Sequence, residues 1–260
     1  MSALPYPIYD IPFHYKAPYP SEPPVDLVSI IIASYNYRDF IEATLDSVLT
    51  QTHKNLELVV VDDCSTDRSV EVITCWLTQH KDRFLRAILA KPHHNQGLAQ
   101  TRNSAVRLAC GGKIFVLDSD NMLFPNCIAR HCEVMDRTGA EVVYSIFEWF
   151  GAIKQPGMGD FWDPDKLKYG NYIDAMAMFS KTAWSEVGEY SYFDVMGWED
   201  YDLWLKFIDR GFTGVFIPEV LCRYRVHPAS MSFQETGPKG LRLIVEMTAR
   251  HPWLDLDPIR

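Results

Sequence analysis

The sequence lacks four features that would assign it to large classes of protein. It has no apolar run of 18 residues, so it predicts no membrane-spanning helix, and its start lacks the basic residues of a signal peptide. Its 25 Lys and Arg residues are outnumbered by 34 Asp and Glu, and a net charge of −9 argues against a nucleic-acid-binding protein. Its six cysteines form no C-x-x-C pair, which favours reduced thiols in a cytoplasmic setting. Contact with the inner face of a membrane stays open.

The sequence does contain enough apolar residues for a large core. Hydrophobic residues make up 47% of the 260 positions and aromatic residues 13%, which excludes global disorder. Residues 1–27 are rich in Pro and Tyr and predict an extended arm over the surface, or a linker. Residues 28–232 carry the regular pattern of a folded domain, and residues 233–260 predict a C-terminal helical extension.

Strands and helices alternate in the first part of this domain. Strands are predicted over 28–33, 56–61, 84–90 and 113–117. Three helices are predicted between them: one over 39–50, one that begins after residues 65–67, and one that ends at residues 111–112. Past Pro125 the pattern predicts a helix at 126–138, a strand at 141–147, a loop at 150–169, a helix after Trp198, short strands at 213–217 and 220–226, and a helix at 239–250. This order predicts βαβ units, and therefore an α/β fold with a mainly parallel sheet.

Two carboxylates follow directly after the predicted strand 113–117. The run Asp118-Ser119-Asp120-Asn121 lies where that strand ends, and ligands of open α/β sheets collect outside the carboxyl ends of strands. An Asp-x-Asp pair at this position suits a divalent metal held against a diphosphate, because such metals take one or two carboxylates and fill their other positions with water and phosphate oxygens. The alternative is an acidic β-turn closed by a side-chain hydrogen bond.

Two further predicted strands end in side chains that can bind a ligand, at the same edge of the predicted sheet. The first strand ends in Ala33-Ser34-Tyr35-Asn36, and the second ends in Asp62-Asp63. An aromatic ring that stacks on a base, together with carboxylates that accept its N–H groups or ribose hydroxyls, suits a nucleoside diphosphate. Taken one at a time, Tyr35 is better explained as a core or rim aromatic, and the two aspartates as a helix N-cap.

The order of these motifs resembles that of family 2 glycosyltransferases, which have the GT-A fold. Six segments carry the resemblance over residues 28–232: SIIIASYN, VVVDDCSTD, NQGLAQTRN, FVLDSDN, GWEDYDLW and YRVH. The resemblance implies inverting transfer of a sugar from a nucleotide sugar, usually a UDP-sugar, to an acceptor hydroxyl in glycan or polysaccharide synthesis. It also implies a Rossmann-like nucleotide-binding half at 28–121, fused to a smaller acceptor-binding half at 122–232. The sugar stays open, and so does the acceptor, which is a polysaccharide, a lipid-linked glycan or a protein.

The resemblance assigns a nucleotide pocket. Tyr35 and Asp63 match the positions that hold the base, with Asp62 beside them. Arg102 matches an arginine that supports the pocket. Members of the family often carry Pro or Thr at the position of Ala33, so a hydroxyl contact to the base is absent from this chain.

The resemblance also assigns a metal site for Mn²⁺ or Mg²⁺. Asp118, with Ser119, matches the ribose side of the site and is a candidate metal ligand as well, while Asp120 matches the principal ligand. His227 falls where some members place an additional contact to the metal or the diphosphate. Asn121 replaces an Asp that many members carry, and its amide can still form hydrogen bonds.

The pair Glu199-Asp200 matches the acidic pair beside the acceptor, with Asp200 as the catalytic base. Inverting displacement requires a carboxylate within hydrogen-bond reach of the attacking hydroxyl. Gly197 and Trp198, directly before the pair, suit a close-approach turn with an aromatic platform for a sugar ring. The alternatives are acidic residues favoured in the first turn of a helix, and a tryptophan that belongs to the core.

Two other functions compete with a glycosyltransferase. A sugar nucleotidyltransferase predicts a glycine-rich phosphate loop after the first strand, and residues 34–38 contain no glycine. A non-catalytic carbohydrate-binding module would need only the fold, and the joint presence of Asp118, Asp120 and Asp200 argues against it.

Overall fold

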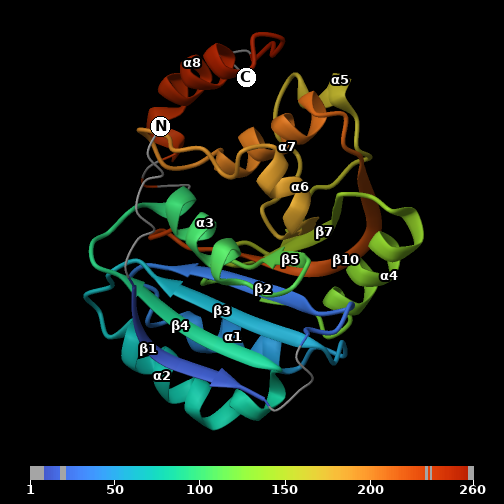
Figure 1. Ribbon diagram of the computed structural model, residues 1–260. Helices are drawn as coiled ribbons and strands as arrows, with labels where there is room; N and C mark the ends of the chain where they lie inside the picture. The colour runs from blue at the N-terminus through green and yellow to red at the C-terminus, as the bar shows by residue number, and fades with distance from the viewer. Residues whose placement is uncertain (1–8, 18–21, 232–233, 235, 257–260) are drawn as a thin grey trace, which may run out of the picture.

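The protein is described here by a computed structural model, which covers residues 9–17, 22–231, 234 and 236–256. Within this part of the chain, ten strands form one mixed sheet in the order β1-β4-β3-β2-β5-β9-β7-β10-β6, with β8 paired to β7 (Figure 1). None of the helices in the described ranges is long and apolar enough to cross a bilayer. The predicted α/β class with a mainly parallel sheet is confirmed.

The first half of the sheet is built from parallel strands joined by helices. Its elements are β2 (Val28–Ser34), α1 (Ile41–Leu49), β3 (Leu56–Asp62), α2 (Ser69–His80), β4 (Arg86–Pro92), α3 (Leu98–Leu108) and β5 (Lys113–Val116). A 3-10 turn, Lys81–Arg83, follows α2. β2 pairs in parallel with β3 and β5, and β3 with β4. The continuous apolar runs that predicted these strands reflect burial on both faces of the sheet, as parallel sheets require.

The Pro- and Tyr-rich start of the chain contributes a strand that the sequence predicted only as an extended arm. β1 (Tyr9–Lys16) pairs antiparallel with β4, from Tyr9 opposite Pro92 to Lys16 opposite Arg86. Its register shifts between Asp10 and Phe13. Residues 1–8 and 18–21 of the predicted arm lie outside the described residues.

The second half of the chain extends the same sheet and adds helices. Its elements are β6 (Met122–Leu123), α4 (Cys127–Thr138), β7 (Val142–Gly151), β8 (Gln155–Pro156), α5 (Pro164–Leu167), β9 (Ala177–Ser180), α6 (Lys181–Glu186), α7 (Glu199–Asp209), β10 (Gly214–Val226), the 3-10 turn Gly237–Lys239 and α8 (Gly240–Arg250). The predicted loop 150–169 therefore contains a short strand and one helical turn. β9 lies antiparallel between β5 and β7 and joins the two halves.

One prediction in this half was wrong. The two short strands expected at 213–217 and 220–226 are a single strand, β10, which runs parallel to β7. The register shifts between Ile217 and Val220, around Pro218, because proline has no N–H to give to the ladder. The bulge keeps the strand continuous to Val226, beside the loop that carries His227.

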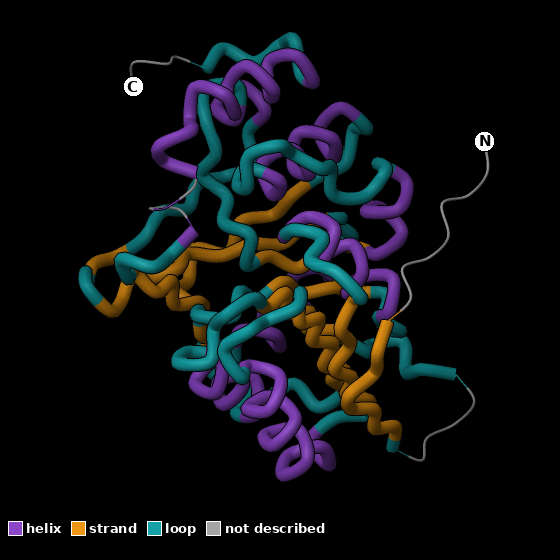
Figure 2. The backbone as a smooth tube through the Cα atoms, turned by 90° about the vertical axis from the view of Figure 1, so that its left-hand side faces the viewer, coloured by secondary structure: helices purple, strands orange, loops and turns teal. Residues whose placement is uncertain are grey.

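Two apolar layers cover the two faces of the sheet. Helices α1, α2 and α4 pack on one face, and α3, α6, α7 and α8 on the other. Figures 1 and 2 show the strands between these two sets of helices. Side chains alternate along each strand, so that Ile30 and Ile32 of β2 face the first set while Ile31 faces the second.

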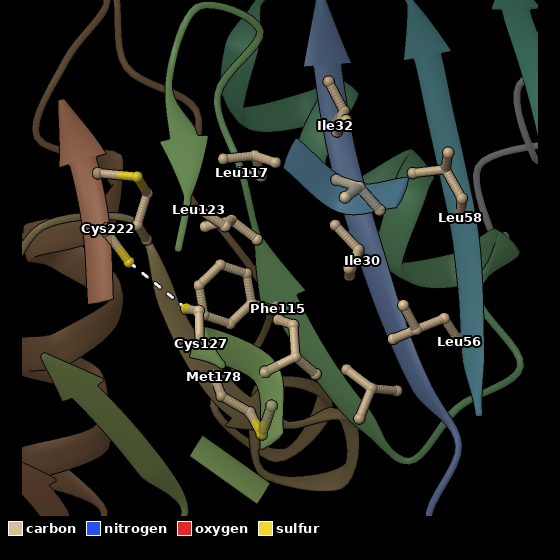
Figure 3. Packing of buried hydrophobic residues seen from close by; sticks show 14 of the residues in the cluster. Ile30, Ile32, Leu56, Leu58, Phe115, Leu117, Leu123, Cys127, Met178 and Cys222 are labelled. Atoms are coloured by element: carbon tan, nitrogen blue, oxygen red, sulfur yellow. Dashed lines mark hydrogen bonds between the residues drawn. The ribbon is translucent and has the colours of Figure 1, made fainter. Parts of the chain in front are cut away.

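The packing of the first layer is close and includes sulfur atoms. Phe115 and Leu117 lie beside Ile30 and Ile32 (Figure 3). Cys127 of α4 and Cys222 of β10 point toward each other, with their Sγ atoms 3.7 Å apart. All six cysteines are free thiols, and burial raises the pKa of the Cys127 thiol well above its ordinary value.

Candidate active site

A cleft of about 490 Å³ opens at the carboxyl ends of β2, β3 and β5. Parallel pairing places Ser34 opposite Asp62, and Leu117 donates its N–H to Ile31, so the three strands end at one edge. The predicted site residues that line this cleft are Ala33, Tyr35, Asp63, Arg102, Asp118, Ser119, Asp120 and His227. A cavity of this size suits a small-molecule ligand such as a nucleotide.

The Tyr35 ring lies on the wall of the cleft and is 45% exposed, so it can receive a planar ligand. Next to it, Ser34 Oγ is buried without a hydrogen-bond partner among the described residues. Ser119 donates its hydroxyl to the Ala33 carbonyl over 2.6 Å, which ties the end of β5 to the end of β2. The sequence did not single out Ser34, because no spacing signal distinguishes a serine whose hydroxyl is buried without a hydrogen-bond partner.

Asp63 anchors the loop that leads into α3. Its carboxylate accepts hydrogen bonds from the backbone N–H groups of Gln96 and Gly97, each over 2.9 Å. Burial raises the pKa of Asp63, and these two hydrogen bonds act in the opposite direction. Gly97 has a φ of +80°, a conformation that favours glycine, so this turn fixes the start of α3 and thereby Arg102.

Asp62 does not line the cleft. It is completely buried, and its carboxylate accepts hydrogen bonds from the N–H and the hydroxyl of Ser65, over 2.8 and 2.6 Å. Burial raises its pKa. In this structure Asp62 closes the turn after β3, and its contact with a nucleotide stays a prediction.

Arg102 bridges two carboxylates that come from distant parts of the chain. Its guanidinium donates to Asp118 over 2.6 Å and to Glu199 over 2.5 Å, and the residue is only 3% exposed. Burial alone would lower the pKa of Arg102, but the two carboxylates raise it well above its ordinary value. The arginine stays charged, and it ties the end of β5 to the start of α7.

Asp120 and His227 are in direct contact on the wall of the cleft. His227 Nε2 lies 2.9 Å from Asp120 Oδ2, and the His227 ring packs on Phe40 with centroids 4.5 Å apart. Arg225 donates to the Asp120 carbonyl over 2.8 Å, and its backbone N–H donates to the Asn121 side chain. The amide of Asn121 therefore holds the end of β10 against the acidic turn.

Asp118 and Asp120 of the acidic turn offer carboxylate oxygens, the ligands that divalent cations prefer. Burial, and then the negative charge of Asp118, raise the pKa of Asp120 to about 6, while His227 opposes this shift. Across residues 9–17, 22–231, 234 and 236–256, no three His, Cys, Asp or Glu side chains are grouped to enclose a metal by themselves. A divalent cation held by Asp120 and its neighbours, and completed by diphosphate oxygens and water, fits this donor set.

The Glu199-Asp200 pair begins α7, beyond a strained turn. Gly197 has a φ of +111° and Trp198 a φ of +66°. A Cβ atom on Gly197 would lie 2.4 Å from Thr236 Oγ1, so the loop requires glycine. The Trp198 indole is partly buried in the second apolar layer, with its centroid 6.1 Å from that of the Tyr201 ring.

Asp200 is partly buried and accepts a hydrogen bond from Asn171 over 3.2 Å. Burial, and then the charge of Glu199, raise its pKa to about 7, with Arg102 opposing the shift. Burial and the charge of Asp118 likewise raise the pKa of Asp174 to about 7. Sequence reasoning missed Asp174, because it lies in a segment without periodicity or motif.

Known proteins and a family model match the sequence of this chain. The family model described as "Glycosyl transferase family 2" matches residues 29–187. WfaP of Escherichia coli, a UDP-Glc:alpha-D-GlcNAc-diphosphoundecaprenol beta-1,3-glucosyltransferase, is 32% identical over 214 residues, which cover 80% of each chain. WfgD of Escherichia coli, with the same named activity, is 29% identical over 210 residues and 79% of each chain.

Solved structures show the same fold. S. aureus TarS 1–349 in complex with UDP-GlcNAc has a TM-score of 0.67 at 17% identity, over 79% of this chain and 60% of that chain. The mannosyltransferase PcManGT from Pyrobaculum calidifontis, in complex with GDP-Man and Mn²⁺, has a TM-score of 0.68 at 20% identity, over 94% and 68%. These structures have the GT-A fold, which confirms the predicted fold class. The family match and the similarity to WfaP together show that this chain belongs to glycosyl transferase family 2 and is a glycosyltransferase.

Proposed function

We propose that the protein transfers a sugar from a UDP-sugar to an acceptor hydroxyl, with inversion, in glycan synthesis. The observation that carries the proposal is the double ion pair of Arg102, which sets the acidic turn of β5 beside the start of α7. Asp118 on the donor side is thereby joined through Arg102 to Glu199, the neighbour in sequence of the candidate base Asp200. The first half of the chain, 28–121, supplies most of the donor pocket, and the second, 122–232, supplies the base.

The donor assignment is supported by the cleft and by the relatives. The exposed Tyr35 ring can stack on a base, and the buried Ser34 Oγ next to it has no hydrogen-bond partner within the described ranges. WfaP and WfgD are named as UDP-glucose-dependent enzymes, and TarS binds UDP-GlcNAc. PcManGT binds GDP-Man, so a GDP-sugar is the alternative donor for this chain.

The acidic turn supports dependence on Mn²⁺ or Mg²⁺. Asp120, with Asp118 and His227, would hold the ion, and PcManGT was solved with Mn²⁺. When bound, a divalent cation neutralises the charge that develops on a diphosphate leaving group. Arg102 keeps Asp118 in place, and Arg225 and Asn121 hold His227 near Asp120.

Asp200 suits the role of the base. A carboxylate whose pKa lies near 7 can take a proton from a hydroxyl and still be ionised in a useful fraction at neutral pH. Asp200 accepts the acceptor proton as the acceptor oxygen bonds to the anomeric carbon, and the bond to the diphosphate breaks on the opposite face. A single displacement of this kind inverts the configuration.

The acceptor we propose is a lipid-linked glycan at the cytoplasmic face of the membrane. WfaP and WfgD are named for an acceptor in which GlcNAc is attached to diphosphoundecaprenol. Polysaccharide and protein acceptors are the alternatives.

Thermal unfolding with UDP or GDP, each with and without Mn²⁺, tests the donor and metal sites. A ligand at a hundred times its dissociation constant adds about 2.7 kcal/mol, which raises the Tm by about 5–10 °C in a domain of this size. We expect a rise with UDP that needs Mn²⁺ and is lost in Asp120→Asn but kept in the surface control Asp136→Asn. No rise with either nucleotide, or a rise that Asp120→Asn leaves intact, contradicts the proposal.

A further inference from the structure

Helix α8 presents apolar side chains on the side that faces away from the core. Leu243 and Met247 are buried in the second apolar layer, whereas Leu241 is 65% and Val245 69% exposed. These two residues are four positions apart, so they lie side by side on the helix surface, with Ala249 one turn further. We call Leu241, Arg242, Val245 and Ala249 the outer face of α8. A surface helix ordinarily carries polar residues there.

The charge of this helix differs from that of the whole protein. The chain carries a net charge of −9, yet α8 contains Arg242 and Arg250 against the single acid Glu246, and Lys239 lies directly before it. Arg250 pairs with Glu246 over 2.7 Å, and Arg242 lies exposed on the outer face. Apolar side chains together with cations are typical of helices that lie on anionic lipid.

Both ends of α8 are attached to the loop that precedes α7. Ahead of the helix, Thr236 Oγ1 donates to the Met196 carbonyl over 3.0 Å. At its end, Arg250 donates to the Tyr192 carbonyl over 2.7 Å and lies over the Phe193 ring. Figures 1 and 2 show α8 on the outer side of the helical layer, away from α1 and α2.

The same loop borders the active site. Tyr192, Met196 and Glu199 line a second pocket of about 290 Å³, and Met196 and Gly97 are shared between this pocket and the donor cleft. Tyr192 and Met196 are themselves exposed. The loop before α7 therefore connects α8 to this pocket and, through Met196, to the donor cleft.

We propose that the outer face of α8 docks on the anionic headgroup surface of a lipid bilayer. Leu241 and Val245 enter the boundary between headgroups and acyl chains, and Arg242 faces the anionic headgroups. The inference deepens the proposed function and rests on it, since docking would hold the second pocket and the cleft close to the sugar of a lipid-linked acceptor. A second copy of the chain is a poorer occupant, because one helix face is small against the roughly 800 Å² per partner of a stable interface.

Flotation of the full chain with vesicles tests this inference. The vesicles are phosphatidylcholine alone, or phosphatidylcholine mixed with phosphatidylglycerol. We expect binding to the anionic vesicles, a loss of about tenfold or more in the double variant Leu241→Ser/Val245→Ser, and a loss of about fivefold in Arg242→Glu. The matched control Ile153→Ser/Met158→Ser alters two exposed apolar side chains of another loop and keeps native binding.

Three results would overturn the inference. The native chain does not float with anionic vesicles, or the α8 double variant floats as well as the native chain, or sedimentation velocity shows a native dimer that this variant dissociates. Thermal unfolding with UDP and Mn²⁺ is measured on the same samples and should not differ between the native chain and the α8 variant. A missing nucleotide effect in the native chain counts against the proposed function, whereas flotation reports on the helix alone.

Discussion

The guanidinium of Arg102 donates to Glu199 over 2.5 Å, although the two residues are 97 positions apart in the sequence. Its other terminal nitrogen donates to Asp118. Arg102 is buried, and its charge neutralises the buried carboxylate of Glu199 and the partly buried carboxylate of Asp118, which would otherwise repel each other. The geometry of the donor side and that of the base side therefore depend on one side chain.

Replacing Arg102 by Ala should lower the free energy of unfolding by about 3–5 kcal/mol, since it leaves the buried carboxylate of Glu199 and the partly buried carboxylate of Asp118 without a counter-charge. The matched control is Arg107→Ala on the same helix. Arg107 pairs with Glu189 at a partly exposed position, so its loss should cost about 1 kcal/mol or less. Urea unfolding of both variants measures the difference. Equal losses would show that the Arg102 bridge adds nothing beyond a surface pair.

The raised pKa of Asp200 predicts the pH dependence of transfer. The ionised form is the active base, so kcat/KM should rise with pH to a plateau, with an apparent pKa near 7. Asp200→Asn should lower kcat by about a thousandfold while the Tm increase with UDP and Mn²⁺ persists. The control Asp165→Asn changes an exposed carboxylate and should keep native turnover. Native turnover in Asp200→Asn would assign the base to another residue.

Asp174 should destabilise the folded protein once it is ionised. Its pKa is about 7 in the folded state against about 3.9 in an unfolded chain. The folded state therefore holds the proton more tightly, and its stability falls as pH rises from about 4 to 7 and then stays constant. Asp174→Asn removes this loss and should raise the free energy of unfolding by about 2 kcal/mol at pH 8, and by much less at pH 4.5.

Urea unfolding at the two pH values measures the effect of Asp174→Asn. Asp136→Asn, at an exposed carboxylate paired with Lys113, serves as the control and should show no such gain at pH 8. A gain for Asp174→Asn that is the same at both pH values would mean that the charge of Asp174 is not its cause.

Gly197→Ala should disturb the turn before α7. Its Cβ would lie 2.4 Å from Thr236 Oγ1, and its φ of +111° is unfavourable for alanine, so we expect a loss of about 2–3 kcal/mol. Gly211→Ala is the matched control, because it also has positive φ, at +80°, but its Cβ would meet no atom within 4 Å. Its loss should be about 1 kcal/mol. If the two variants unfold alike, contact with Thr236 contributes nothing to the stability of the turn.

The strands that carry the donor site could be predicted because burial on both faces leaves an unbroken apolar run. The run ahead of Asp118 shows this directly, and the acidic turn follows it in the structure as expected. The strand β10 was harder to predict. A proline such as Pro218 usually indicates the end of a strand, but in the structure it lies at a bulge within a continuous strand. The helix with Glu199 at its start was predicted from apolar spacing.

The links between distant segments could not be predicted. Nothing in one sequence pairs Arg102 with Glu199, or Asn121 with the backbone of Arg225, because such contacts depend on how the sheet is ordered. The hydrogen bond from Ser65 to the Asp62 carboxylate could not be predicted either. Two adjacent aspartates look alike in sequence and differ only in the face of the strand from which they project.

The strand β1 has a consequence for how the protein behaves at high concentration. It pairs with the outer side of β4 from Arg86 to Pro92, apart from the register shift between Asp10 and Phe13, and an unpaired edge there would recruit strands from neighbouring molecules. Its own outer side is a poor template, because Pro12 offers no N–H and because Asp10 and Lys16 carry charge. β1 thus covers one edge of the sheet and protects it against aggregation.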